Sequence, residues 1–331
     1  FDFFFYWAHR WSHEINFFWA AHVVHHSSED YNLSVALRQS WWHNLIAFFI
    51  FMPLPVLGFD PLIFFLAAGL HTIYQFWIHT QAVGKLHPWI EYVMNTPSHH
   101  RVHHGRNPKY IDKNHGGVFI IWDRLFGTFQ AEEEAPTYGI TTPLNSLNPA
   151  WANLHYYAEM WGNMRKMRFW KDRWKMLWAK PGWLPEDMGG MQNPPPIDEA
   201  AKKKYDPKMR RHFTWYVAAQ FGLIVLGLVG MMLYFEELSW FYRLTFFGIL
   251  LLSTMICGAL LENKRWVVRV EYVRLILVVL SVNSLYYFQY MDWFVTMLIA
   301  SGAGFLVFNL WFTLSWRWAK RIETTYPHFK H

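Results

Sequence analysis

Residues 9–26 read HRWSHEINFFWAAHVVHH, and residues 96–104 read TPSHHRVHH. The first stretch contains an H-x-x-x-H pair and an H-x-x-H-H cluster, and the second repeats H-x-x-H-H. Residues three and four apart share one face of a helix, so each cluster can direct its imidazoles to one point. Two exact copies of H-x-x-H-H arise by chance in about one in a thousand chains of this composition, which favours a metal site. The eight histidines of these clusters are His9, His13, His22, His25, His26, His100, His103 and His104.

Eight imidazoles are too many for one ion, because a single catalytic zinc takes about three protein ligands. We therefore predict two ions with four or five nitrogens each, and His79, which ends an apolar run, as the ninth ligand. Imidazole suits iron, copper, nickel or zinc, so ligand type leaves the metal open. His13 and His22 lie about half a turn out of phase, so the helix must bend or break, or the clusters approach from opposite sides. Thr96 is the expected N-cap of the third cluster, with Pro97 at the first helical position.

Other histidines are less informative. His71 lies two turns before His79, about 12 Å along a helix, and shares a face with Gln75. These two residues line a substrate channel or are hydrogen-bonded packing residues, with equal weight on either reading. His99 does not complete the repeated spacing, and interfacial or surface positions are expected for six others: His43, His87, His155, His212, His328 and His331.

The composition points to lipid. Of 331 residues 53% are apolar, 20% are aromatic and only 16% are charged, where about 25% is usual for a soluble domain. This excludes a disordered or collagen-like chain. The mean hydropathy is only +0.02, so the apolar residues must be concentrated in segments. Cys257 is the single cysteine, which excludes an intrachain disulfide, a cysteine zinc finger and an iron–sulfur cluster.

Six apolar runs approach the roughly 20 residues that a membrane helix needs. Pro53 and Pro55 interrupt the first, which suits half of a helical hairpin closed at 58–61. The short loops near 58–60, 236–239 and 291–292 carry no Lys or Arg, whereas the other connections do, which places the histidine side in the cytoplasm. The membrane would be the endoplasmic reticulum in a eukaryote or the inner membrane in a bacterium. The six runs are 41–57, 61–79, 213–235, 240–261, 272–290 and 293–312.

We therefore expect an all-α integral membrane protein. A helical membrane hairpin would carry a cytosolic histidine-rich helical cap, followed by a C-terminal bundle of four membrane helices.

Residues 161–180 hold seven Lys or Arg against one Asp, with three tryptophans at helical spacing. This stretch lies in the headgroup region or is an amphipathic helix packed on the cytosolic domain. The expected divisions are 1–145 catalytic, 146–212 interfacial segment and linker, 213–315 membrane bundle and 316–331 basic tail. Phe1–Ala8 reads like a helix already under way, so we expect further chain before it.

The three histidine clusters, in this order and attached to a membrane hairpin, resemble those of the fatty acid hydroxylase and sterol desaturase superfamily of membrane di-iron oxygenases. Asn114, Gly116 and WDRLFGT at 122–128 also resemble that superfamily, although His115 stands where an aromatic residue is common. Residues 13–40 and 74–114 are similar to a narrower group, the tetrahydrobiopterin-dependent monooxygenases that cleave the ether bond of alkylglycerols.

The resemblance implies two irons, O2 as co-substrate and tetrahydrobiopterin as electron donor. It also implies hydroxylation of the ether-linked carbon, giving a fatty aldehyde and a glycerol derivative. Glu14, beside the first cluster, is implied as a residue important for activity, either in catalysis or in holding the pterin. A rival reading is another hydroxylase or desaturase of the superfamily, acting on a fatty acyl chain, sterol or carotenoid with a protein electron donor. A histidine-rich metal transporter or sensor is more remote. It predicts ionisable residues at mid-membrane in several helices, whereas the runs at 213–235 and 293–312 contain none.

Overall fold

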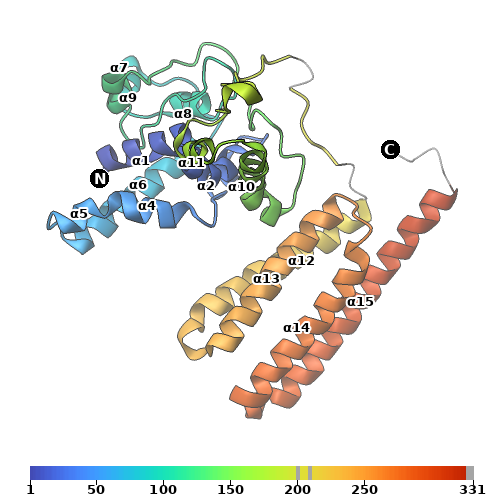
Figure 1. Cartoon of the computed structure of the whole chain (residues 1–331). Coiled ribbons are helices and arrows are strands. Elements are labelled where there is room, and N and C mark those ends of the chain that lie inside the picture. Colours follow the sequence, from blue (N-terminus) through green and yellow to red (C-terminus); the bar gives the residue numbers. More distant parts are fainter. Residues whose placement is uncertain (199–201, 208–210, 326–331) are drawn as a thin grey trace. The chain divides into compact units, whose positions relative to one another are not determined.

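The computed structural model describes residues 1–198, 202–207 and 211–325, and Figure 1 traces its helices. Within these ranges every regular element is a helix, and only Met94 and Phe119 form an isolated β-bridge, which agrees with the expected all-α class. Side chains of residues 211–212 and from 318 onward, including most of the basic tail, lie outside the description. The chain divides into an N-terminal unit, 1–145 with 151–205, and a C-terminal unit, 146–150 with 206–331.

The N-terminal unit holds the histidine-bearing helices and the hairpin. Its α-helices are α1 Asp2–Glu14, α2 Asn16–His26, α3 Leu33–Ala36, α4 His43–Phe51, α5 Pro53–Val56, α6 Pro61–Ile78, α7 Pro88–Val93, α8 Pro97–His103, α9 Ile121–Phe126, α10 Pro149–Lys166 and α11 Trp170–Trp178. The first two residues of α10 fall in the C-terminal unit.

The helix breaks between the first two clusters, which is one of the two arrangements that the helical phase allows. Ile15 is extended, with φ −121° and ψ 120°, so that α1 ends at Glu14 and α2 begins at Asn16. The Asn16 side chain fixes the corner by donating from Nδ2 to the Met176 carbonyl at 2.9 Å. Because α1 and α2 then pack against each other, their histidines face a common point.

The hairpin follows its prolines. Helix α4 stops before Pro53, the turn contains Gly58 at φ 87°, and Asp60 caps α6 by accepting from the Leu62 and Ile63 amides. Helix α6 is long and apolar enough to cross a membrane, whereas α4 and α5 form a shorter apolar segment.

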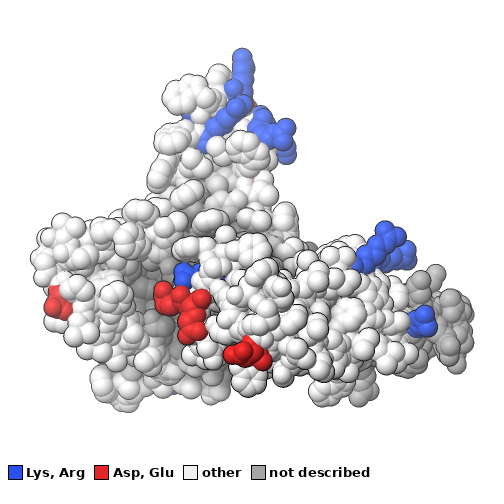
Figure 2. Space-filling view, turned by 90° about the horizontal axis from the view of Figure 1, so that it is seen from below, with Lys and Arg blue, Asp and Glu red and all other residues white. Residues whose placement is uncertain are grey.

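The C-terminal unit is built from four helices that pack in sequence and close with α12 against α15. They are α12 Arg211–Leu233, α13 Trp240–Leu261, α14 Val267–Gln289 and α15 Phe294–Thr325. By length and composition four helices of the described chain can span a membrane: α6, 213–233, α13 and 291–317. The chain is thus a multi-pass membrane protein, and the surface in Figure 2 is mostly uncharged. The expected run at 272–290 is helical and lies within α14, but it is not among the four.

The basic stretch 161–180 is not one helix, contrary to its sequence pattern. Helix α10 ends at Lys166 and α11 starts at Trp170 after an extended Phe169. This turn brings the side chains of Met160, Met167 and Met176 into one buried cluster, which a continuous helix would separate.

Candidate metal centre

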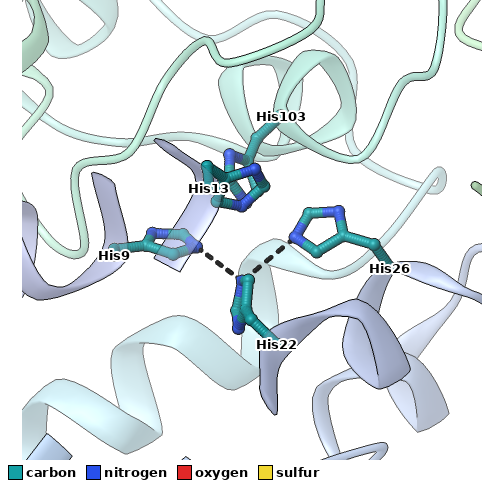
Figure 3. A group of neighbouring side chains, drawn as sticks. All are labelled: His9, His13, His22, His26 and His103. Carbon is teal, nitrogen blue, oxygen red and sulfur yellow. Dashed lines mark hydrogen bonds between the residues drawn. The ribbon is translucent and has the colours of Figure 1, made fainter. Parts of the chain in front are cut away.

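Five buried histidines of the N-terminal unit form the first histidine group. Their ligand atoms all lie within 4.8 Å of one another, and Figure 3 shows the side chains pointing to one centre. Helices α1, α2 and α8 each contribute to the group. Its members are His9, His13, His22, His26 and His103.

Four further histidines form the second histidine group, again within 4.8 Å and buried. His79 belongs to it because α6 ends there, with the His79 amide closing the last turn on the Phe76 carbonyl. The members are His25, His79, His100 and His104. The structure therefore brings all nine expected histidines into two groups of five and four, while metal binding by them stays a prediction.

Backbone carbonyls fix how four of these rings are protonated. The Nδ1 atoms of His9, His25, His79 and His103 lie 2.7–3.3 Å from the carbonyls of His115, Arg38, Gln75 and Lys113. A carbonyl only accepts, so each Nδ1 carries the proton and each Nε2 presents a lone pair. Burial also lowers the pKa of these rings, to about 4 for His79, which keeps them neutral.

The resulting lone pairs fit metal ions. The Nε2 atoms of His25 and His79 are both acceptors, yet they face each other at 3.3 Å. The Nε2 atoms of His13, His103 and His104 are buried with no hydrogen-bond partner among the described residues. Nitrogens 2.0–2.1 Å from one ion stand about 2.9 Å apart at an octahedral corner and about 3.4 Å apart in a tetrahedron. The observed Nε2 separations of 2.9–3.3 Å fall in this range, so a shared cation would satisfy facing acceptors.

One loop supplies two of the orienting carbonyls, those of Lys113 and His115. Asp123 holds this loop by accepting from the amides of His115 and Gly116, both at 2.7 Å. The Asn114 side chain adds bonds to the carbonyls of His99 and Gln130. Gly116 is required here, because a Cβ would stand 2.4 Å from the Phe119 carbonyl. These residues of the superfamily pattern thus orient the rings without joining either group.

His99 takes part in the cap of α8, whereas its neighbour His100 belongs to the second histidine group. Its Nδ1 accepts from the Thr96 amide at 3.4 Å and its Nε2 lies 3.0 Å from Glu91, so it belongs to the predicted cap of α8. Burial opposes the charge on Glu91, but bonds from His99, Leu86 and Thr96 lower its pKa to about 2.

Sequence reasoning missed one carboxylate beside the first group, Asp112, and it noted His115, which also lies there, only as a departure from the superfamily pattern. Asp112 lies 3.9 Å from Nδ1 of His13, and burial raises its pKa to about 6. His115 is fully buried near His9, His13 and His103, and its two ring nitrogens find no partner in the described structure. No spacing signal marks Asp112, which reaches the group only because the loop turns at φ 55°.

A cavity of about 660 Å³ joins the second group to the hairpin. Phe51, Phe64 and Ala68 are among its apolar walls, and His79 and His100 stand at its polar end. Both expected channel residues line it, and they are also hydrogen-bonded: Gln75 Nε2 to His71 Nδ1 at 2.7 Å, and His71 Nε2 to Asp2 at 2.6 Å. The two readings of His71 and Gln75 therefore coexist in the geometry.

Glu14 lies outside both groups. Its carboxylate pairs with Arg10 at 3.2 Å and with Lys180 at 3.7 Å. It is partly exposed beside Asp112, whose charge it influences. The structure thus places Glu14 next to the first group without making it a member.

Comparison with known proteins agrees with this geometry. Residues 1–128 match the model of the fatty acid hydroxylase family, and the matched stretch includes every histidine of both groups. No solved structure matches the chain.

Matches to curated relatives cover more of the chain than the family match does. Proteins named alkylglycerol monooxygenase are 38% identical over 283 residues in Danio rerio, 39% over 231 in Xenopus tropicalis and 45% over 184 in Homo sapiens. These matches cover 83%, 70% and 56% of the chain but 62%, 51% and 41% of the relatives. The chain thus spans about half the length of the curated relatives it matches.

Proposed function

We propose that the chain is a membrane di-iron monooxygenase that hydroxylates the ether-linked carbon of alkylglycerols. The observation that carries the proposal is the pair of buried histidine groups at the end of an apolar cavity. The relatives named alkylglycerol monooxygenase support the choice of substrate. Two irons, one held by the five histidines of the first group and one by the four of the second, would activate O2. Tetrahydrobiopterin would supply the electrons. One oxygen atom enters the C–H bond and the other leaves as water.

The protein's own part is to position the alkyl chain and exclude water. The cavity volume of about 660 Å³ lies within the range of small-ligand sites, about 300–1,000 Å³. Its apolar walls from α4 and α6 would take the alkyl chain from lipid, leaving the ether carbon near His79 and His100. The hydroxylated carbon is a hemiacetal, which breaks to a fatty aldehyde and a glycerol derivative.

Glu14 is proposed to meet the pterin. A reduced pterin offers N–H donors, and an ionised carboxylate is a strong acceptor for them. Asp112 lies near, so the carboxylates would present acceptors beside the first group. The positive-inside pattern supports a cytosolic position for this face, in the endoplasmic reticulum of a eukaryote or the inner membrane of a bacterium.

The second candidate is a hydroxylase or desaturase of another lipid with a protein electron donor. Matches of 31% to an ornithine lipid hydroxylase and 29% to a sterol desaturase favour it, but each covers at most 40% of the chain. It makes the opposite prediction for the electron donor, since tetrahydrobiopterin would not support turnover.

The test combines metal analysis with turnover of the purified full chain. We expect two irons per chain and aldehyde release from an alkylglycerol that requires tetrahydrobiopterin. His100→Ala should lose iron and activity, whereas His87→Ala, at an exposed position, should retain both. Iron-loaded protein that turns over only with a protein donor, or only a fatty acyl or sterol substrate, favours the second candidate. Protein that binds metal without turning over any lipid favours a transporter or sensor.

A further inference from the structure

A buried polar cluster lies inside the C-terminal unit, where residues of α12, α13 and α14 meet. Arg274 donates to both carboxylate oxygens of Glu271, at 2.6 and 2.7 Å, and Tyr216 donates to the same carboxylate. The guanidinium also donates to Ser253 at 3.2 Å and to the amide oxygen of Gln220 at 2.9 Å. Glu271 and Arg274 are both buried, and burying charged groups is costly unless they are paired and hydrogen-bonded.

The Gln220 side chain leaves its donor unused. Arginine only donates, so the amide oxygen must face Arg274 and the NH2 group must point away. That Nε2 atom is buried, with Gln220 only 3% exposed, and has no hydrogen-bond partner in the described structure. The ion pair alone would be a structural contact, but an unpartnered buried amide beside it points to a ligand.

A cavity of about 770 Å³ begins at this cluster. Gln220, Ser253 and Arg274 line one end, and apolar side chains such as Leu250 and Val278 line its course toward Tyr286. From Arg274 to Tyr286 it follows twelve residues of α14, about 18 Å at 1.5 Å per residue. The cavity thus has a polar end and a long apolar body.

We propose that this cavity binds an uncharged single-chain lipid with an oxygen-bearing end group, such as a long-chain alcohol. The Gln220 amide donates to the ligand oxygen, and the chain fills the apolar body. Arg274 and Glu271 neutralise each other, so a carboxylate would find no uncompensated cation there. The histidine groups belong to the N-terminal unit, and the inference does not depend on the proposed reaction.

The test uses the full chain in nanodiscs and a photoreactive diazirine analogue of hexadecanol. We expect labelling of α12–α14 peptides that unlabelled hexadecanol displaces and that hexadecane and palmitate do not. Gln220→Met keeps the length and removes the donor, and should weaken competition by hexadecanol about 2- to 10-fold, the value of one neutral hydrogen bond. Equal competition by hexadecane, or stronger competition by palmitate, overturns the proposal.

A volume test needs no polar change. Gly304 lines the cavity and a Cβ there meets nothing within 4 Å, whereas Gly302, two residues away with equal space, does not line it. Gly304→Leu should reduce labelling and Gly302→Leu should leave it unchanged, with thermal melts confirming that both variants fold. Equal labelling of the two variants also overturns the proposal.

Discussion

The Oε2 atom of Glu14 lies 3.2 Å from Nε of Arg10, one turn earlier on α1. Lys180 approaches the other carboxylate oxygen at 3.7 Å. This basic pair holds the carboxylate in place and outside both histidine groups. We therefore expect Glu14 to bind a molecule beside the first histidine group and not to ligate a metal.

For Glu14→Gln we expect unchanged iron content and a higher KM for tetrahydrobiopterin. Hydrogen bonds to a charged acceptor contribute about 1.5–3 kcal/mol, so the KM should rise about 10- to 150-fold. Steady-state kinetics at limiting pterin, with iron measured on the same sample, check this. A variant that loses iron indicates instead that Glu14 supports a ligand imidazole, and full activity at limiting pterin contradicts any role.

Asp123 is expected to act on the metals from a distance, through the loop at 113–116. Asp123→Asn weakens the bonds from His115 and Gly116, so the carbonyls that orient His9 and His103 shift. Loss of such orienting partners typically costs about 10- to 100-fold in metal affinity. Competition with a chelator should show this loss, whereas Glu133→Gln on the exposed surface should not. An unchanged metal affinity in Asp123→Asn would show that the loop at 113–116 does not support metal binding.

Acid should destabilise the metal-free protein through the buried histidines. Burial lowers their pKa, to about 4 for His79, against about 6.5 in the unfolded chain. Below pH 6.5 the unfolded state therefore binds more protons, and the free energy of unfolding falls as the pH drops toward 4. Thermal melts from pH 8 to 4.5 should show a falling Tm, with exposed His87→Ala as a control of equal slope. A Tm that stays constant between pH 7 and 5 contradicts the burial of neutral rings.

The spacing of the histidines in the sequence predicted which of them lie together, because residues three and four apart share a helical face. The helical phase gave a bend or break between His13 and His22 as one of two alternatives, and the local Thr96-Pro97 signal predicted the cap of α8; the structure has both features. Asp112 and the buried position of Arg274 were not predictable, because each depends on contacts between segments distant in sequence. The turn between α10 and α11 was missed for the same reason, since it depends on Met160 meeting Met176.

The cavity of about 660 Å³, which we propose holds the alkyl chain, gives a prediction about substrate chain length. Ala68 lines it on α6, whereas the adjacent Ala67 does not. Ala68→Phe should shorten the cavity and lower kcat/KM for long-chain alkylglycerols more than for short-chain ones, while Ala67→Phe should change neither. The chain-length profile of aldehyde release measures this. Equal losses at all chain lengths would place the alkyl chain elsewhere.

Helix α11 distinguishes the two readings of the basic segment. Trp170, Trp174 and Trp178 are 51–79% exposed, whereas Met176 is buried and packs with other methionines. An exposed tryptophan face beside basic residues suits the headgroup region of a membrane.

We therefore expect Trp174→Ala to change the free energy of unfolding in detergent by less than about 0.5 kcal/mol, as for a surface site. Met176→Ala should lower it by about 2–5 kcal/mol, as for a core site. A Cys257→Ser background allows an environment-sensitive fluorophore to be attached at one new cysteine. On Trp174→Cys it should shift to the blue in nanodiscs, while on Lys175→Cys, an exposed position one residue on and therefore about 100° around the helix, it should shift less. If Trp174→Ala is as destabilising as Met176→Ala and the fluorophore does not shift, α11 is an ordinary packed helix and its tryptophans do not meet lipid.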